Sequence, residues 1–390
     1  MESPFIMNRR LTKLAHTAIG AVLTVLLAAG SATGFEDSTT KRDTPKAAPA
    51  TDVTLARARR QVLDAHPLAM FYFANDLRGR ESLVAHARAM TLLGPQSYWL
   101  DREGFVHGQI RAEVLDVARH SGLALMPLVV NPHFDRSAAH ALLHNPKACE
   151  HAATSLAYLA KRDHFVGWQL DIENIDPDDK LDFTNFVELV AAGVHRDGGL
   201  LSVAVVPRFS DTYPDSPPVQ FQTDEWGAAY DYAALGEAAD FLAVMTYDQH
   251  SSRTPPGPVA GYDWVKAVLD YALRCVPPAK LLLGLPLYGR EWVETPHGTT
   301  THSFTYTNLG RFLKNAGGKP QWDENSRTTW YQAHSGAIQR TVWFDDARSL
   351  REKLQLVESY HLRGFACWRL GVEDPRFWTL MTRKKAKNEN

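Results

Sequence analysis

Short apolar runs alternate with helical segments from Leu68 onward, and this alternation constrains the architecture more than any other feature of the sequence. Repeated strand–helix units of this kind form a parallel sheet, because each helix carries the chain back to the same edge. Eight strands over about 320 residues is the count of a (β/α)8 barrel. The sequence therefore predicts an α/β fold of the TIM-barrel type. The predicted strands lie near residues 68–74, 92–99, 123–131, 164–173, 200–206, 240–247, 281–288 and 363–369.

The carboxyl ends of these predicted strands carry polar and aromatic side chains. In a (β/α)8 barrel the active site forms at that end. Aromatic faces stack on the C–H faces of sugar rings, so this collection suits a sugar. We therefore expect one cleft that binds a carbohydrate. The candidate residues at the strand ends are Asn131, Asp171, Glu173, Arg208, Tyr247, Asp248, Tyr288, Arg290 and Trp368.

The segment between the seventh and eighth predicted strands is too long for a single helix. Residues from about 290 to 344 are rich in Trp, Tyr, Thr and His, which predicts a small α+β insertion that walls one side of the cleft. A helix is expected from about Asp345 to Tyr360. The whole domain is expected to span residues 55–382, and the basic tail at 383–390 is interpreted as a solvated end.

The amino terminus differs from the rest of the chain. A basic segment precedes an apolar run from about Ala18 to Ala29, and small residues follow as far as Gly34. The apolar run is shorter than the roughly 20 residues of a membrane span, and the pattern is typical of a secretory signal peptide. We expect residues 1–34 to be this signal and residues 35–54 to be a flexible spacer. The protein is then secreted or periplasmic without a stable membrane span; an uncleaved membrane anchor is the alternative.

Composition excludes some classes of function. The formal net charge of -2 gives no indication of a nucleic-acid partner. The only cysteines are Cys149, Cys275 and Cys367, and so sparse a set indicates a fold that depends on its core rather than on disulfides. The sequence contains no Gly-rich phosphate loop after an early strand and no Gly-x-Ser-x-Gly turn, and we predict no cofactor.

The predicted fourth strand ends in two acids. Side chains alternate along a β-strand, which gives this one a polar face and an apolar face. Carboxylates two residues apart lie roughly 7 Å from each other and repel. The charge of Asp171 thus makes it harder for Glu173 to lose its proton, as a general acid for glycosidic cleavage requires; the alternative is a strand edge that meets solvent. The polar face carries Gly167, Gln169, Asp171 and Glu173, and the apolar face carries Val166, Trp168, Leu170 and Ile172.

The segment Gly167–Glu173 resembles the signature of glycoside hydrolase family 18, the chitinase-like family, whose fullest form reads Asp-Gly-x-Asp-x-Asp-x-Glu. The chain keeps the glycine, the third Asp as Asp171 and the final Glu as Glu173. It departs from the pattern at Val166 and Gln169, which stand at the first and second Asp positions. The departures leave the proton donor in place but remove the Asp that serves a proton relay in the fuller pattern.

Three further strand ends resemble the same family, in the same order along the chain. They are Met245–Asp248 on the sixth strand, Gly284–Arg290 on the seventh and Gly364–Arg369 on the eighth. The resemblance implies that Tyr247 donates a hydrogen bond to the acetamido group of the substrate, and that Trp368 forms the floor under the cleaved sugar. The predicted substrate-binding residues are Gln169, Asp248, Trp368, Arg208, Tyr288 and Arg290, with Tyr72, Asn131 and Trp226 as weaker candidates that line the cleft.

The resemblance implies a glycosidase that cleaves β-linked glycans containing N-acetylglucosamine by substrate-assisted, retaining hydrolysis. Glu173 is then the acid and base, Asp171 orients the acetamido N–H, and Tyr247 holds the acetamido oxygen. Chitin, peptidoglycan and N-linked glycans all contain this sugar, and all three are kept as substrates. Some members of the family have lost the acid and bind sugars as lectins; Glu173 favours an enzyme, and the lectin is the alternative.

His140 and His144 stand one helical turn apart, a spacing typical of metal ligands. The residues between them lack the glutamate of a zinc protease, and no third ligand is evident along the sequence. We therefore expect solvated or capping histidines and predict no metal site.

Overall fold

The computed structural model describes residues 52–209, 226–316 and 319–381. The predicted signal peptide at 1–34 and the basic tail at 383–390 lie outside these residues, as does the predicted spacer up to residue 51. Helix α1 (Asp52–Asp64) begins inside the segment expected to be a spacer, so residues 52–54 are helical.

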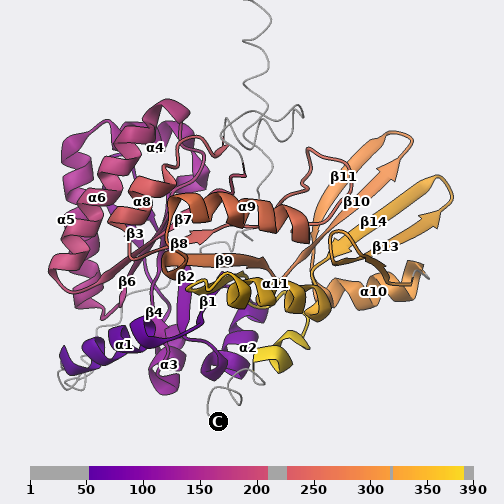
Figure 1. The fold of residues 1–390 in the computed structure, drawn as a ribbon, viewed down its shortest axis with the longest axis horizontal. Coiled ribbons are helices and arrows are strands. Elements are labelled where there is room, and N and C mark those ends of the chain that lie inside the picture. The colour runs from indigo at the N-terminus through magenta and orange to yellow at the C-terminus, as the bar shows by residue number, and fades with distance from the viewer. Residues whose placement is uncertain (1–51, 210–225, 317–318, 382–390) are drawn as a thin grey trace, which may run out of the picture. The chain divides into compact units, whose positions relative to one another are not determined.

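Eight parallel strands form a closed barrel, which confirms the fold class predicted from the alternation of apolar and helical segments (Figure 1). Each strand pairs with its neighbours in chain order, and β1 pairs with both β2 and β15 to close the ring. The strands are β1 (Leu68–Phe73), β2 (Leu92–Leu100), β5 (Leu128–Val130), β6 (Gly167–Asp171), β7 (Leu200–Val205), β8 (Phe241–Val244), β9 (Leu281–Pro286) and β15 (Gly364–Trp368).

The third predicted strand is divided into β4 (Ala124–Leu125) and β5, with Pro127 in the gap. Proline has no backbone N–H to donate to a neighbouring strand. Its carbonyl still accepts the N–H of Gln169 at 3.0 Å, so the strand direction continues through the break. A short strand, β3 (Val106–Gly108), pairs antiparallel with the end of β2.

The apolar core has an inner and an outer layer, because side chains alternate along each strand. In β1, Leu68, Met70 and Tyr72 belong to the cluster inside the barrel, and the alternate residues belong to the cluster between strands and helices. Val62 of α1 joins the inner cluster, so α1 closes the amino-terminal end of the barrel. The cleft expected from the sequence therefore belongs at the opposite end.

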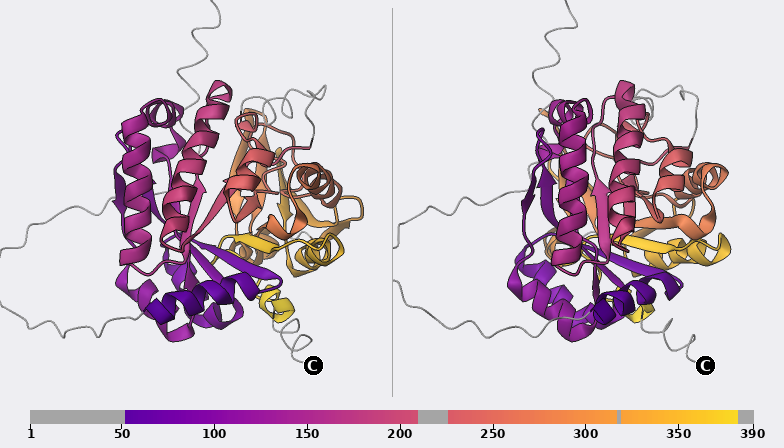
Figure 2. Two further views of the ribbon diagram at one scale, coloured as in Figure 1. Left: turned by 60° about the vertical axis from the view of Figure 1, so that its left-hand side comes forward. Right: turned by 90° about the vertical axis from the view of Figure 1, so that its left-hand side faces the viewer.

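Helices cover the outside of the barrel (Figure 2). They connect successive strands, as the repeated strand–helix pattern predicts, and the expected helix at 345–360 is present as α11. The helices are α2 (Leu77–His86), α3 (Ala112–Ser121), α4 (Arg136–Leu143), α5 (Pro146–Arg162), α6 (Lys180–Arg196), α8 (Tyr232–Ala238), α9 (Tyr262–Cys275) and α11 (Ala347–Ser359), with short 3-10 turns at η1 (Ala87–Ala89), η2 (Pro132–Phe134), η3 (Pro177–Asp179) and η5 (Pro278–Lys280).

The chain between β9 and β15 forms the predicted α+β insertion (Figure 1). Its five-stranded antiparallel sheet has the order β11-β10-β14-β13-β12. Leu309 and Phe312 of its helix pack with Tyr331, Val342 and Phe344 of the sheet, so the insertion has an apolar core of its own. The elements are β10 (Gly289–Thr295), β11 (Gly298–Phe304), α10 (Tyr306–Ala316), β12 (Gln321–Asp323), β13 (Thr328–Ser335) and β14 (Ile338–Phe344).

Cys149, Cys275 and Cys367 are free thiols, so apolar packing stabilises the fold without a disulfide among them. Across the described ranges, no helix combines the length and the apolar character needed to cross a bilayer.

Candidate active site

Strand β6 brings the signature residues to the carboxyl end of the barrel. A side chain at Gly167 would bring a Cβ within 1.7 Å of the Leu200 carbonyl oxygen on β7, so only glycine permits this approach. Trp168, Leu170 and Ile172 belong to the outer core, as predicted. Val166 departs from the expected pattern: it precedes the strand and joins the inner cluster.

Two side chains hold the backbone around Glu173. The Asn131 amide donates to the Glu173 carbonyl oxygen at 2.9 Å and accepts the Glu173 N–H at 3.0 Å. The Tyr230 hydroxyl donates to the Ile172 carbonyl oxygen at 2.7 Å. Asn131 is 1% exposed, so its side chain positions Glu173 instead of lining the cleft as expected. Tyr230 was not among the sequence candidates, because no motif or spacing distinguishes it from the other aromatic residues.

The Asp171 and Glu173 carboxyl groups have raised pKa values. Asp171 is 4% exposed, and burial raises its pKa to about 7. Glu173 is partly exposed; burial first, and then the charge of Asp171, raise its pKa well above the ordinary value. A hydrogen bond from the Trp226 side chain acts in the opposite direction. The effects that raise the pKa of Glu173 outweigh this hydrogen bond. Glu173 therefore keeps its proton to a higher pH than an ordinary glutamate, as a general acid requires.

Replacing Trp226 by Phe tests this balance. Loss of the hydrogen bond to the ionised carboxylate raises the pKa of Glu173, so the alkaline limb of kcat/KM against pH should move up by roughly 0.5–1 pH unit. The profile is measured on a soluble N-acetylglucosamine oligomer. Trp322→Phe is the matched control, because the Trp322 indole also donates to a glutamate, Glu324, at 3.1 Å. A limb that stays in place or moves down contradicts the assignment.

Gln169 occupies the barrel interior below the acids. It is fully buried, and its Nε2 donates to the Tyr72 hydroxyl oxygen at 2.8 Å. The Tyr72 ring in turn lies 5.5 Å from the Trp368 ring, so the structure brings these three predicted residues together. Gln169 Oε1 and Ser202 Oγ, on paired positions of β6 and β7, are both buried without a hydrogen-bond partner.

Tyr247 follows β8 and lies near both acids. Its ring meets the Tyr288 ring edge-on, with centroids 6.5 Å apart. Burial raises its pKa well above the ordinary value, with further contributions from neighbouring groups that include Asp171 and Glu173. The hydroxyl therefore remains a hydrogen-bond donor at neutral pH.

Asp248 links two other predicted residues. Its carboxylate accepts the Tyr288 hydroxyl at 2.6 Å and forms an ion pair with Arg290. Its charge is one of the causes of the raised pKa of Glu173, so Asp248 acts electrostatically on the acid. These contacts connect the segment after β8 to Tyr288 and Arg290, where β9 leads into β10.

Arg208 contacts a ring of the helical layer and the backbone of Tyr230. Its guanidinium lies 5.3 Å from the centre of the Tyr271 ring on α9, and Nη1 donates to the Tyr230 carbonyl oxygen at 3.4 Å. These contacts place the guanidinium between α9 and Tyr230, and the role of Arg208 in substrate binding stays a prediction.

His140 and His144 are exposed to solvent, as expected, but they also share a partner that the sequence did not indicate. Both hydrogen-bond to the carboxylate of Asp179, a third ligand-type side chain that lies more than thirty residues along the chain. Sequence spacing could not reveal it, because the contact depends on how α4 packs beside η3.

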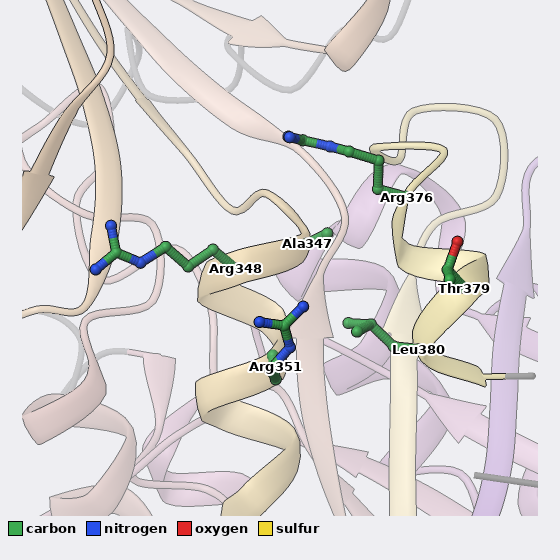
Figure 3. Close-up of a pocket in the computed structure, with 6 residues that line it drawn as sticks. All are labelled: Ala347, Arg348, Arg351, Arg376, Thr379 and Leu380. Atoms are coloured by element: carbon green, nitrogen blue, oxygen red, sulfur yellow. The ribbon is translucent and has the colours of Figure 1, made fainter. Parts of the chain in front are cut away.

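A pocket of about 300 Å³ contains none of the predicted site residues. Arg376 is paired with Asp374 at 2.6 Å, and the Arg348 guanidinium lies 3.6 Å from the centre of the Trp322 ring. The guanidinium of Arg348 also extends away from those of Arg351 and Arg376 (Figure 3), so the three do not converge on one anion. The pocket is lined by Ala347, Arg348, Arg351, Arg376, Thr379 and Leu380.

Comparison with known proteins agrees with this geometry. The family described as glycosyl hydrolases family 18 matches residues 118–373, more than half of the chain. The uncharacterized glycosylase YvbX of Bacillus subtilis is 25% identical over 79% of this chain and 88% of its own length. A cortical fragment-lytic enzyme of the same organism is 27% identical over 75% of this chain and 67% of its own length.

A solved structure extends the comparison to the fold. The chitinase from Chromobacterium violaceum superposes with a TM-score of 0.74 and 26% identity, and covers 82% of this chain and 99% of its own. The family match, the relatives and the strand-end carboxyl groups agree with one another. The chain is a glycosidase that belongs to the glycosyl hydrolases of family 18.

Proposed function

We propose that this glycosidase is exported and cleaves β-linked glycans that contain N-acetylglucosamine by substrate-assisted, retaining hydrolysis. The observation that carries the proposal is the pairing of Asp171 and Glu173 at the end of β6, where burial raises the pKa of Asp171, and burial together with the charge of Asp171 raises the pKa of Glu173. The hydrogen bonds of Asn131 and Tyr230 fix the backbone of this segment, so the acid is preorganised.

In the first step Glu173 gives its proton to the glycosidic oxygen as the bond between that oxygen and the anomeric carbon breaks. The acetamido oxygen of the same sugar forms the new bond to the anomeric carbon, so no nucleophile from the protein is needed. Asp171 accepts the acetamido N–H and stabilises the positive charge that develops on the ring. Tyr247 donates its hydroxyl to the acetamido oxygen and holds it in the direction of attack.

In the second step the Glu173 carboxylate removes a proton from water, and the water oxygen bonds to the anomeric carbon as the acetamido oxygen leaves. The anomeric carbon is inverted twice, so its configuration is retained. Trp368 and Tyr72 supply adjacent aromatic faces under the sugar, which suits its C–H face.

Chitin-like oligomers and peptidoglycan are the first substrates to test, with N-linked glycans as the third; the chain resembles a protein named as a cortical fragment-lytic enzyme and the structure of a chitinase. Export through residues 1–34 would bring the enzyme to either polymer. Finding the exported protein with an amino terminus beyond residue 34 would support this part of the proposal, and an uncleaved cytoplasmic chain would contradict it.

Hydrolysis of soluble N-acetylglucosamine oligomers and of purified peptidoglycan, run side by side with the full chain, tests the function. Chromatography of the products identifies the polymer that is cut. New reducing ends from either substrate support the proposal. Binding of both glycans without cleavage would contradict it and favour the lectin alternative.

A further inference from the structure

Three ligand-type side chains converge outside the candidate active site. His140 lies within α4 and His144 follows its last residue, one turn further on, and Asp179 is the last residue of η3. His140 Nδ1 lies 2.9 Å from Asp179 Oδ2, and His144 Nε2 lies 2.9 Å from Asp179 Oδ1. One ligand atom from each residue falls within 4.8 Å of the other two.

The cluster has a buried base and an accessible rim. The Asp179 side chain is 2% exposed, whereas the two histidine side chains are 54% and 48% exposed. A carboxylate removed from water needs a compensating positive charge. Among the ion pairs of the described residues, Asp179 pairs with these two histidines and with no lysine or arginine.

The ligand types and their spacing suit a zinc-like ion. Imidazole nitrogen and carboxylate oxygen bind Zn²⁺ at about 2.0–2.2 Å, and tetrahedral geometry then separates the ligand atoms by roughly 3.3 Å. Asp179 Oδ1 lies 3.0 Å from His140 Nδ1 and 2.9 Å from His144 Nε2, and the three ligand atoms all lie within 4.8 Å of one another, so small side-chain shifts bring them to this spacing. Asp182, whose Oδ2 lies 3.5 Å from His144 Nε2, or a water can supply a fourth ligand. We propose that His140, His144 and Asp179 form a binding site for a divalent transition-metal ion of the zinc type.

Other histidine–carboxylate pairs in the structure lack this arrangement. His195 Nε2 lies 2.8 Å from Asp240, and His107 Nε2 lies 2.6 Å from Asp101, but each pair has a single imidazole. Within the residues that the structure describes, only the α4 cluster brings three such ligands together. His195 therefore offers a matched control for a simple histidine–aspartate pair.

The metal would cross-link α4 to the segment that carries the acid. This segment runs from Glu173 to Asp179, and Arg136 of α4 already donates to Asn174 Oδ1 at 3.3 Å. A bound ion would add a second connection between the same elements. Its role is structural, since the site does not include Asp171 or Glu173.

Titration of the untagged, chelator-treated full chain with ZnCl2 at pH 7.5 tests the site. Calorimetry measures the binding, and the melting temperature (Tm) is recorded with and without the ion. We expect one ion per chain and a rise in Tm of several degrees, since an ion that binds only the folded state stabilises it. His140→Ala and His144→Ala should each weaken binding at least tenfold and abolish the Tm rise, whereas His195→Ala should bind as the unaltered chain does.

The histidine side chains are about half exposed, so these variants should fold, and circular dichroism of the metal-free proteins verifies this. Absence of stoichiometric Zn²⁺ binding would overturn the proposal. So would unchanged binding in both α4 variants, or an equal loss in His195→Ala. Glycan hydrolysis by the metal-free chain is a separate readout, so failure of the metal site leaves the proposed glycosidase function intact.

Discussion

Glu173→Gln should lower kcat for hydrolysis by roughly 10²–10⁴-fold, the largest effect expected of any single substitution. Glutamine has nearly the same size as glutamate but cannot give a proton to the glycosidic oxygen. The hydrogen bonds that hold this residue use its backbone N–H and carbonyl oxygen, so the variant should keep its fold and its affinity for the oligomer.

Product chromatography and calorimetric binding to the same oligomer, measured together, check this prediction. Glu352→Gln is the control. Glu352 lies on α11, pairs with Arg327 at 3.0 Å and has no part in the proposed chemistry. The control should retain full activity. A Glu173→Gln variant that keeps a tenth or more of the activity would remove this residue from the role of acid.

Asp171→Asn should lower kcat by roughly 10²–10³-fold and at the same time stabilise the protein in alkaline solution. The loss of activity follows because the neutral amide cannot stabilise positive charge on the substrate. The gain in stability follows because burial raises the pKa of Asp171 to about 7, well above the roughly 3.9 of an unfolded chain.

The sign of the stability effect follows from proton linkage. A carboxyl group whose pKa is raised in the folded state contributes stability that is full below about pH 4 and is lost as pH rises to about 7. Asparagine removes this dependence. The free energy of unfolding of Asp171→Asn relative to the unaltered chain should therefore increase from pH 4 to pH 8, by on the order of 2–4 kcal/mol.

Urea unfolding at pH 4 and pH 8 measures this difference. Asp101→Asn is the control of opposite sign, since hydrogen bonds from His107 and the Phe105 N–H outweigh burial and lower the pKa of Asp101. That control should be destabilised at pH 8 and keep its activity. A stability difference between Asp171→Asn and the unaltered chain that stays constant or decreases from pH 4 to pH 8 would contradict the raised pKa.

The barrel could be predicted from the sequence because its strands are buried on both faces and appear as continuous apolar runs, such as Leu281–Leu283. The acids could be found because a parallel barrel gathers strand ends at one edge. The division of the third strand into β4 and β5 could not be predicted, because Pro127 lies within a continuous apolar run. The break is defined by the pairing of these two segments with neighbouring strands.

Contacts between distant segments could not be predicted in the same way. Asn131 was expected to line the cleft, but its side-chain amide hydrogen-bonds to the backbone of Glu173, 42 residues along the chain. Arg208 follows a strand as the other candidates do, and its contact with the Tyr271 ring of α9 could not be predicted from that position. Asp179 joins His140 and His144 through the packing of α4 beside η3, which no local pattern encodes.

The configuration of the first product tests the proposed chemistry most directly. Proton NMR of the anomeric region, recorded during hydrolysis of a soluble N-acetylglucosamine oligomer by the unaltered chain, distinguishes the two anomers before they equilibrate. Substrate-assisted attack with Glu173 as acid and base predicts that the β anomer accumulates first and converts slowly to the α anomer. Accumulation of the α anomer first would contradict the mechanism, because it requires direct attack of water on the opposite face of the sugar.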